Sequence, residues 1–139
     1  MKRKILYILF SLILTSTVAL ADKFVPDFTQ MKKIKCDVEE TIFNQDGSVV
    51  TKNKYFRIFN LDDENQKIYL QKAPVDKINY YENDRIEFYI QSLTDDFIMQ
   101  TNTVIERESG KYSSSSVIDY DSAFFGTRTA KAVGVCSAF

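Results

Sequence analysis

The two cysteines of the chain, Cys36 and Cys136, constrain its architecture more than any other feature, because they lie near opposite ends. A disulfide between them would tie the first strand of a domain to its last. Their separation excludes a catalytic Cys-x-x-Cys motif. The alternative is two separate buried thiols, and the choice between the two depends on the redox compartment.

The N-terminus indicates an oxidising compartment. A basic head at residues 2–4 precedes an apolar stretch at 5–14 and an Ala-Leu-Ala pattern at 19–21. This order is typical of a cleaved secretory signal peptide. An uncleaved anchor is the alternative, but the apolar run is shorter than the roughly 20 residues of a membrane span. We expect residues 1–21 to be a signal peptide, and residues 22–139 to be one periplasmic or secreted domain with a Cys36–Cys136 disulfide and no membrane span.

Alternating apolar and polar residues predict strands around both cysteines. In residues 33–38 Cys36 shares an apolar face with Ile34 and Val38. In residues 129–136 the face that carries Cys136 otherwise holds only alanine and glycine, so another strand or layer can approach closely. The two strands are therefore expected to be neighbours, or to face each other across the core.

The intervening chain also has a β pattern. Runs rich in β-branched and aromatic residues predict strands at 49–60, 67–71, 86–91, 97–108 and 111–120. Asp46-Gly47 and Ser109-Gly110 are typical of two-residue hairpin turns, because glycine accepts a positive φ. Only residues 26–33 have a helix-like pattern. The fold expected is an all-β antiparallel meander, closed as a small barrel or folded as a sandwich, with a short N-terminal helix.

Several kinds of chemistry are disfavoured by composition. The chain has no histidine, the usual general base and commonest metal ligand, and its four glycines form no phosphate-binding loop. Asp119 and Asp121 could contact calcium, but the further ligands of a calcium loop are missing. Acid pairs for glycoside hydrolysis remain, and the candidates are Asp62, Asp63, Glu64, Asp95, Asp96, Glu106, Glu108, Asp119 and Asp121. We expect no enzymatic activity, no cofactor and no resident metal.

The charge balance disfavours a nucleic-acid partner. Removing the three basic residues at 2–4 with the signal peptide changes the formal net charge from −1 to −4. A mildly acidic domain of this kind has no electrostatic footprint for nucleic acid or for an anionic membrane. The expected partner is therefore an envelope protein or a small ligand.

Some aromatic residues are expected in the core, and others are candidates for a binding surface. Phe56, Phe59, Phe88 and Phe97 are expected in the core. The adjacent residues of Tyr80-Tyr81 point to opposite faces of an extended chain, so one of them is exposed or covers something. Exposed aromatic residues are favoured at binding surfaces. A second small cluster under a loop is the alternative.

The hairpin at Ser109-Gly110 is the sharpest candidate for an interaction site. It is expected to project Arg107, Lys111 and Tyr112 near its tip. The four serines at 113–116 suit an exposed edge strand that accepts a partner. An ordinary solvated hairpin is the alternative.

This arrangement resembles that of small exported bacterial β-proteins of unassigned function. The resemblance rests on the leader, a cysteine in the first strand, the hairpin at 105–112 and a Gly-x-Cys near the end. The chain also distantly resembles the periplasmic inhibitors of C-type lysozyme, which are small β-barrels with a cysteine near each end and a Ser-Gly-x-x-Tyr loop. The loop here, residues 109–112, is one residue shorter, and the chain has no tryptophan.

The function expected is that of an exported binding protein without catalytic activity. One alternative is a carrier of a small apolar ligand, which needs an interior cavity of roughly 300 Å³ or more. Another, implied by the second resemblance, is an inhibitor of a lysozyme-type enzyme. The least favoured is an acid-pair hydrolase, with two carboxylates roughly 5 to 9.5 Å apart across a cleft.

Overall fold

Strands account for most of the part of the chain that the structure describes. The computed structural model describes residues 25–122 and 124–139, so the predicted signal peptide lies outside the described residues. The strands are β1 (Lys32–Phe43), β2 (Val49–Asp62), β3 (Lys67–Leu70), β4 (Ala73–Pro74), β5 (Lys77–Tyr81), β6 (Arg85–Leu93), β7 (Phe97–Glu106), β8 (Lys111–Tyr120) and β9 (Thr127–Ala138).

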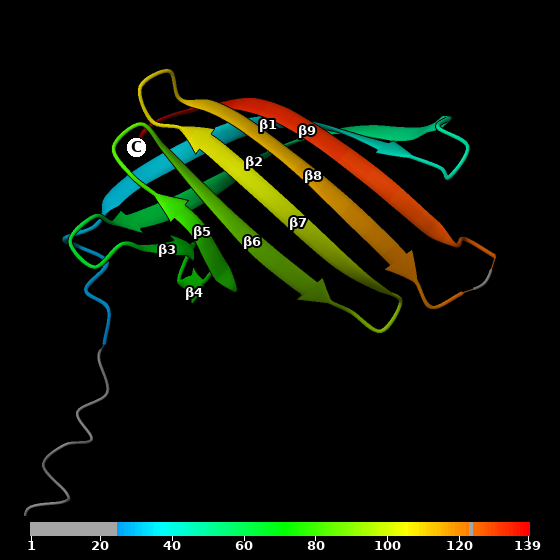
Figure 1. The fold of residues 1–139 in the computed structure, drawn as a ribbon, viewed down its shortest axis with the longest axis horizontal. Coiled ribbons are helices and arrows are strands. Elements are labelled where there is room, and N and C mark those ends of the chain that lie inside the picture. The colour runs from blue at the N-terminus through cyan, green and yellow to red at the C-terminus, as the bar shows by residue number, and fades with distance from the viewer. Residues whose placement is uncertain (1–24, 123) are drawn as a thin grey trace, which may run out of the picture.

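These strands form one antiparallel sheet in the order β4-β3-β2-β1-β9-β8-β7-β6-β5. The sheet curls strongly, so that β3 and β5, near its two edges, approach each other and the whole has the shape of a half-barrel (Figure 1). The all-β antiparallel prediction is confirmed. Sequential strands pair with each other except β4 and β5, which form the two edges of the sheet. β1 and β9 also pair, and they bring the two ends of the described chain together at the centre of the sheet.

The predicted disulfide is present and joins these two central strands. Cys36 of β1 lies directly opposite Cys136 of β9, with their Cα atoms 3.9 Å apart. The two strands pair from Ile34↔Ala138 to Phe43↔Thr129, so the bridge reinforces an extensive ladder. The terminal cysteine therefore fastens the last strand to the first, as expected from the sequence.

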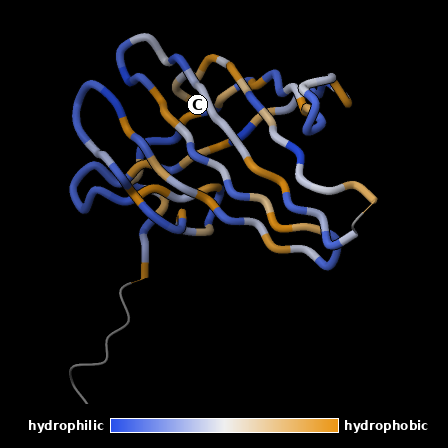
Figure 2. The backbone as a smooth tube through the Cα atoms, turned by 45° about the vertical axis from the view of Figure 1, so that its right-hand side comes forward, coloured by the Kyte–Doolittle hydropathy of each residue, from blue (hydrophilic) through white to orange (hydrophobic). Residues whose placement is uncertain are grey.

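The core lies on the concave face of the sheet, toward one end of the strands. Hydrophobic and hydrophilic residues alternate along parts of the strands (Figure 2), as expected where successive side chains point to opposite faces of a sheet. The rings of Phe59 on β2 and Phe88 on β6 are 5.3 Å apart, although four strands separate β2 from β6 in the sheet. The curl thus lets a single sheet bury its own core. The buried cluster is Ile34, Cys36, Val38, Phe59, Leu61, Ile68, Tyr81, Ile86, Phe88, Ile105, Tyr112 and Ala132.

Three local predictions are wrong. Residues 26–33 do not form a helix: residues 28–30 make a short turn, which Asp27 caps by accepting from the Thr29 N–H at 3.0 Å, and β1 begins at Lys32. Phe56 is not in the core, because it points to the outer face and is 59 % exposed. The hairpin loops at 44–48 and 107–110 are longer than two residues.

The serine-rich strand is also placed differently from the prediction. β8 lies between β7 and β9 and pairs along its full length with both, so it is a central strand. The small side chains face close neighbours: the buried hydroxyls of Thr101 and Ser116 are 2.8 Å apart. The edges are instead β4 and β5, and Pro74 on β4 lacks the N–H that an added strand would need.

Candidate interaction surfaces

Arg107, predicted at an exposed hairpin tip, is held against two other loops. Its guanidinium donates to both carboxylate oxygens of Asp63, at 2.7 and 2.9 Å, and to the carbonyl of Glu82 at 3.3 Å. The side chain of Arg107 is only 15 % exposed. It therefore connects the β7–β8 loop to the loops that follow β2 and β5, where the two edges of the curled sheet approach.

Tyr81 completes this connection, and we call Asp63, Tyr81 and Arg107 the latch. The buried Tyr81 hydroxyl donates to Asp63 at 2.7 Å, and the guanidinium carbon of Arg107 lies 5.6 Å from the Tyr81 ring centre. Burial and the hydrogen bond to Asp63 raise the pKa of Tyr81. Burial alone would raise the pKa of Asp63, but the hydrogen bonds from Tyr81 and Arg107 outweigh it and lower that pKa.

The latch makes stability depend on pH in the acid range. Because the folded pKa of Asp63 lies below its ordinary value of 3.8, the ionised carboxylate stabilises the fold above that value. The contribution is lost as the pH falls through the lower folded pKa. Asp63→Asn should cost about 1 kcal/mol near neutral pH, a small figure because solvent screens the half-exposed carboxylate. Urea unfolding at several pH values should show the difference from wild type vanishing in acid; a constant difference would contradict the prediction.

Tyr112 does not project from the hairpin. It is fully buried in the core, opposite Ile105 and Gly134 in the sheet, so the prediction of an exposed anchor is wrong. Successive side chains of a strand point to opposite faces, and Tyr112 lies on the face of β8 that points into the half-barrel.

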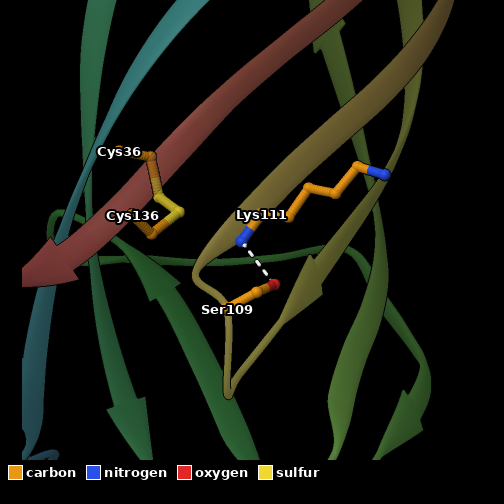
Figure 3. Close-up of a disulfide and its surroundings, with 4 residues drawn as sticks. All are labelled: Cys36, Ser109, Lys111 and Cys136. Atoms are coloured by element: carbon orange, nitrogen blue, oxygen red, sulfur yellow. Dashed lines mark hydrogen bonds between the residues drawn. A yellow bond between two sulfur atoms is a disulfide. The ribbon is translucent and has the colours of Figure 1, made fainter.

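Ser109 and Gly110 shape the turn that leads to Tyr112. The Gly110 carbonyl accepts from the N–H of Cys136 at 2.7 Å. The Ser109 hydroxyl accepts from the N–H of Lys111 at 3.2 Å (Figure 3). A Cβ at Gly110 would lie 2.2 Å from the Cys136 carbonyl oxygen, and its φ is +73°. Both residues therefore have clear structural roles beside the disulfide.

Tyr80 and Lys111 are the predicted residues that face outward. The guanidinium of Arg85 stacks on the Tyr80 ring, 4.1 Å from its centre, and the Tyr80 hydroxyl donates to Asp84 at 3.4 Å. The side chain of Lys111 extends away from the disulfide along the outer face (Figure 3). Its ammonium makes no ion pair with any residue in the described ranges. The structure thus separates Lys111 from the other predicted residues of the hairpin.

Lys111 borders a groove of about 690 Å³, which we call the outer groove. Its outward-pointing apolar residues are Val133 and Val135 on β9, which are 60 % and 63 % exposed. The groove is lined by Asp37, Val38, Glu39, Lys54, Tyr55, Lys111, Tyr112, Val133, Gly134 and Val135. It lies over the four strands at the centre of the sheet, two of which the disulfide joins.

The charges around the outer groove are only partly compensated. Lys54 and Glu39 form an ion pair of 2.8 Å, and the hydrogen bond and charge of Lys54 lower the pKa of Glu39. Asp37 lies 3.6 Å from Lys35. Lys111 is left as a cation beside two exposed valines, an arrangement that suits an apolar side chain next to a carboxylate.

Sequence reasoning missed the two valines, although the signal was present. The pattern of residues 129–136 identified a face of small residues, Ala130, Ala132, Gly134 and Cys136, and this face does point inward. The same alternation requires Val133 and Val135 to point outward. A strand that buries alanine and exposes valine inverts the usual pattern, and this inversion is the signal.

A second groove, of about 490 Å³, lies on the open side of the half-barrel, and we call it the inner groove. Burial raises the pKa of Tyr55 to about 12, and the Tyr55 hydroxyl donates to Glu40 at 3.5 Å. The lining is Glu40, Tyr55, Phe56, Arg57, Ile58, Leu70, Gln71 and Met99. The mixture of charged and apolar residues differs from the predominantly apolar lining expected of a carrier for an apolar molecule.

Asp62, Asp63 and Glu64 line a groove of about 400 Å³ together with Asp27, but the other acidic residues considered for catalysis or calcium are not part of its lining. Within the described ranges, no group of three or more His, Cys, Asp or Glu residues could hold a metal ion. Asp63 belongs to the latch, Asp62 accepts from the amide of Asn65, and Asp119 accepts from Thr127 at 2.8 Å. These carboxylates therefore have local structural partners.

Comparisons with family models, with curated proteins and with solved structures gave no match. In the part of the chain that the structure describes, no helix is long and apolar enough to cross a membrane.

Proposed function

We propose that this is an exported binding protein without catalytic activity, which recognises a partner protein through the outer groove. The observation that carries the proposal is the exposure of Val133 and Val135 on a hollowed face, where a soluble domain would ordinarily present polar side chains. The disulfide between β1 and β9 supports rigidity at this position, and preorganised surfaces bind with a smaller entropic cost.

The lining of the groove indicates the chemistry of the partner. The two valines offer contact to an apolar side chain, and the ammonium of Lys111 offers a charge-assisted hydrogen bond to a carboxylate. Glu39 and Lys54 already form an ion pair with each other, so they do not need a charged partner. The pair selects against partners that cannot lie beside it. A surface loop with an apolar residue next to Asp or Glu fits these features.

The location proposed is the periplasm or the exterior of the cell. Structural disulfides are typical of oxidising compartments, and the leader-like pattern at residues 1–21 supplies a route there. The partner is then expected among envelope or extracellular proteins.

Capture experiments with matched variants test this proposal. The mature protein should retain a specific partner from an envelope extract, and Val133→Ser/Val135→Ser should weaken the interaction by at least about 1 kcal/mol. Lys111→Glu should do the same. Val117→Ser is the matched control, because Val117 is an exposed valine on the same face and lies outside the groove. Equal retention by all four proteins would place the binding surface elsewhere.

A further inference from the structure

β2 has a long stretch without a partner on one side. It pairs with β1 from Val49 to Leu61, but with β3 only from Phe59 to Asp62. The part of β2 that extends past β3 has only β1 as a neighbouring strand (Figure 1). Among the described residues, none pairs with the other side of residues 49–57, and this stretch, which we call the free edge, is the longest unpaired edge of the sheet.

The backbone groups of the free edge alternate in direction. The carbonyl of Ile58 accepts from the N–H of Gln71 at 2.9 Å, so Ile58 directs its backbone groups away from β1. In an antiparallel ladder every second residue does the same. The β1–β2 ladder has a bulge at Val50, so this alternation holds from Thr51 onward, and the residues whose N–H and C=O groups point outward are Lys52, Lys54 and Phe56. Such a row of unused donors and acceptors is a template for an added strand.

The free edge is basic in an otherwise acidic domain. Lys52, Lys54 and Arg57 lie on it, and β2 has no acidic residue before Asp62. Lys54 is paired with Glu39, whereas Lys52 and Arg57 make no ion pair within the described ranges. Arg57 also lines the inner groove, toward which every second side chain of an added strand would point.

We infer that the free edge of β2 binds an extended acidic peptide segment by strand addition. A second copy of this chain fits less well, because antiparallel pairing of two β2 edges would bring Lys52, Lys54 and Arg57 of both copies together. Like charges opposite each other destabilise strand pairing. Lys52 and Arg57 point to opposite faces of the sheet, because Arg57 lies opposite the inward-facing Cys36 and successive residues alternate. A partner strand that alternates acidic and apolar residues bonds to the backbone groups of the free edge and places its acidic side chains on one face, beside Lys52. This inference does not depend on the outer groove.

Amide hydrogen exchange of the isotope-labelled mature protein tests the inference. The probe is a peptide of alternating valine and glutamate, long enough to pair with residues 49–57. Binding should slow exchange at least about tenfold at Lys52, Lys54 and Phe56. The amides of Thr51, Asn53 and Tyr55 point toward β1 and should be unchanged. Equal protection of both sets, or no binding at a peptide concentration of about 1 mM, would overturn the inference.

Matched variants separate strand addition from simple charge attraction. Lys52→Glu should weaken peptide binding about fivefold, whereas Lys131→Glu, an exposed lysine on the outer face of β9, should not. A fully N-methylated version of the peptide keeps its charge but cannot pair, so it should not bind. Binding of that version as tight as the original would overturn strand addition. Protection that rises with protein concentration in the absence of peptide would show that a second copy covers the edge.

Discussion

Replacing Cys36 and Cys136 together by alanine should lower the free energy of unfolding by up to about 4 to 5 kcal/mol without changing the fold. The loss is large because the bridge closes a loop of sequence separation 100, and so restricts the unfolded chain strongly. The fold should persist because β1 and β9 remain paired over Ile34 to Phe43. Chemical unfolding checks the first point and a far-ultraviolet circular dichroism spectrum the second.

Reduction of the wild-type protein is the control for this experiment. Alanine at Cys36 also removes a buried sulfur, since that residue is fully buried, so part of the loss in the variant comes from packing. The reduced wild type lacks the bridge but keeps both sulfur atoms, and it should show most of the same loss. Alkylation of the native protein without reductant should label neither cysteine; two labelled cysteines would contradict the bridge itself.

Truncation of Tyr112 to alanine should be the most damaging single change to the core, at about 3 to 5 kcal/mol. Its ring is fully buried, and it contacts the cluster that closes the half-barrel. The melting temperature should fall by many degrees. An unchanged melting temperature would mean that this side chain is at the surface, as the sequence alone suggested.

Tyr112→Phe separates the ring from its hydroxyl. The hydroxyl is buried, and no described residue gives it a hydrogen-bond partner. Because a buried polar group without a partner is unfavourable, its removal should leave stability within about 1 kcal/mol of the wild type or raise it. A loss as large as that of the alanine variant would show that the hydroxyl has a partner essential to the fold.

The outer groove and the free edge could be read only in part from the sequence. Lys111 was a candidate from its place beside the Ser109-Gly110 turn, and it does border the outer groove. Val133 and Val135 follow from the alternation of β9, once its inward face is known. The free edge could not be found, because the 49–60 pattern predicts a strand but not where β3 stops pairing with it. That point depends on the turn after Leu70, where Gln71 adopts a positive φ of 57°.

By itself the sequence determined the bridge and every strand except β4 and β5, for which no strand was predicted. Alternation with a period of two is a local property, so β1, β6 and β9 were recognisable from the order of their side chains. The two cysteines could pair in only one way.

Only the tertiary structure decided which aromatic residues are buried and which strands are edges. Phe56 is exposed and Tyr112 is buried, the reverse of what the sequence pattern predicts. Phe59 meets Phe88 only because the sheet curls. Curl and strand order arise from the packing of residues distant in sequence, and no local pattern encodes them. For this reason β8 is a central strand, while the free edge of β2 remains unpaired.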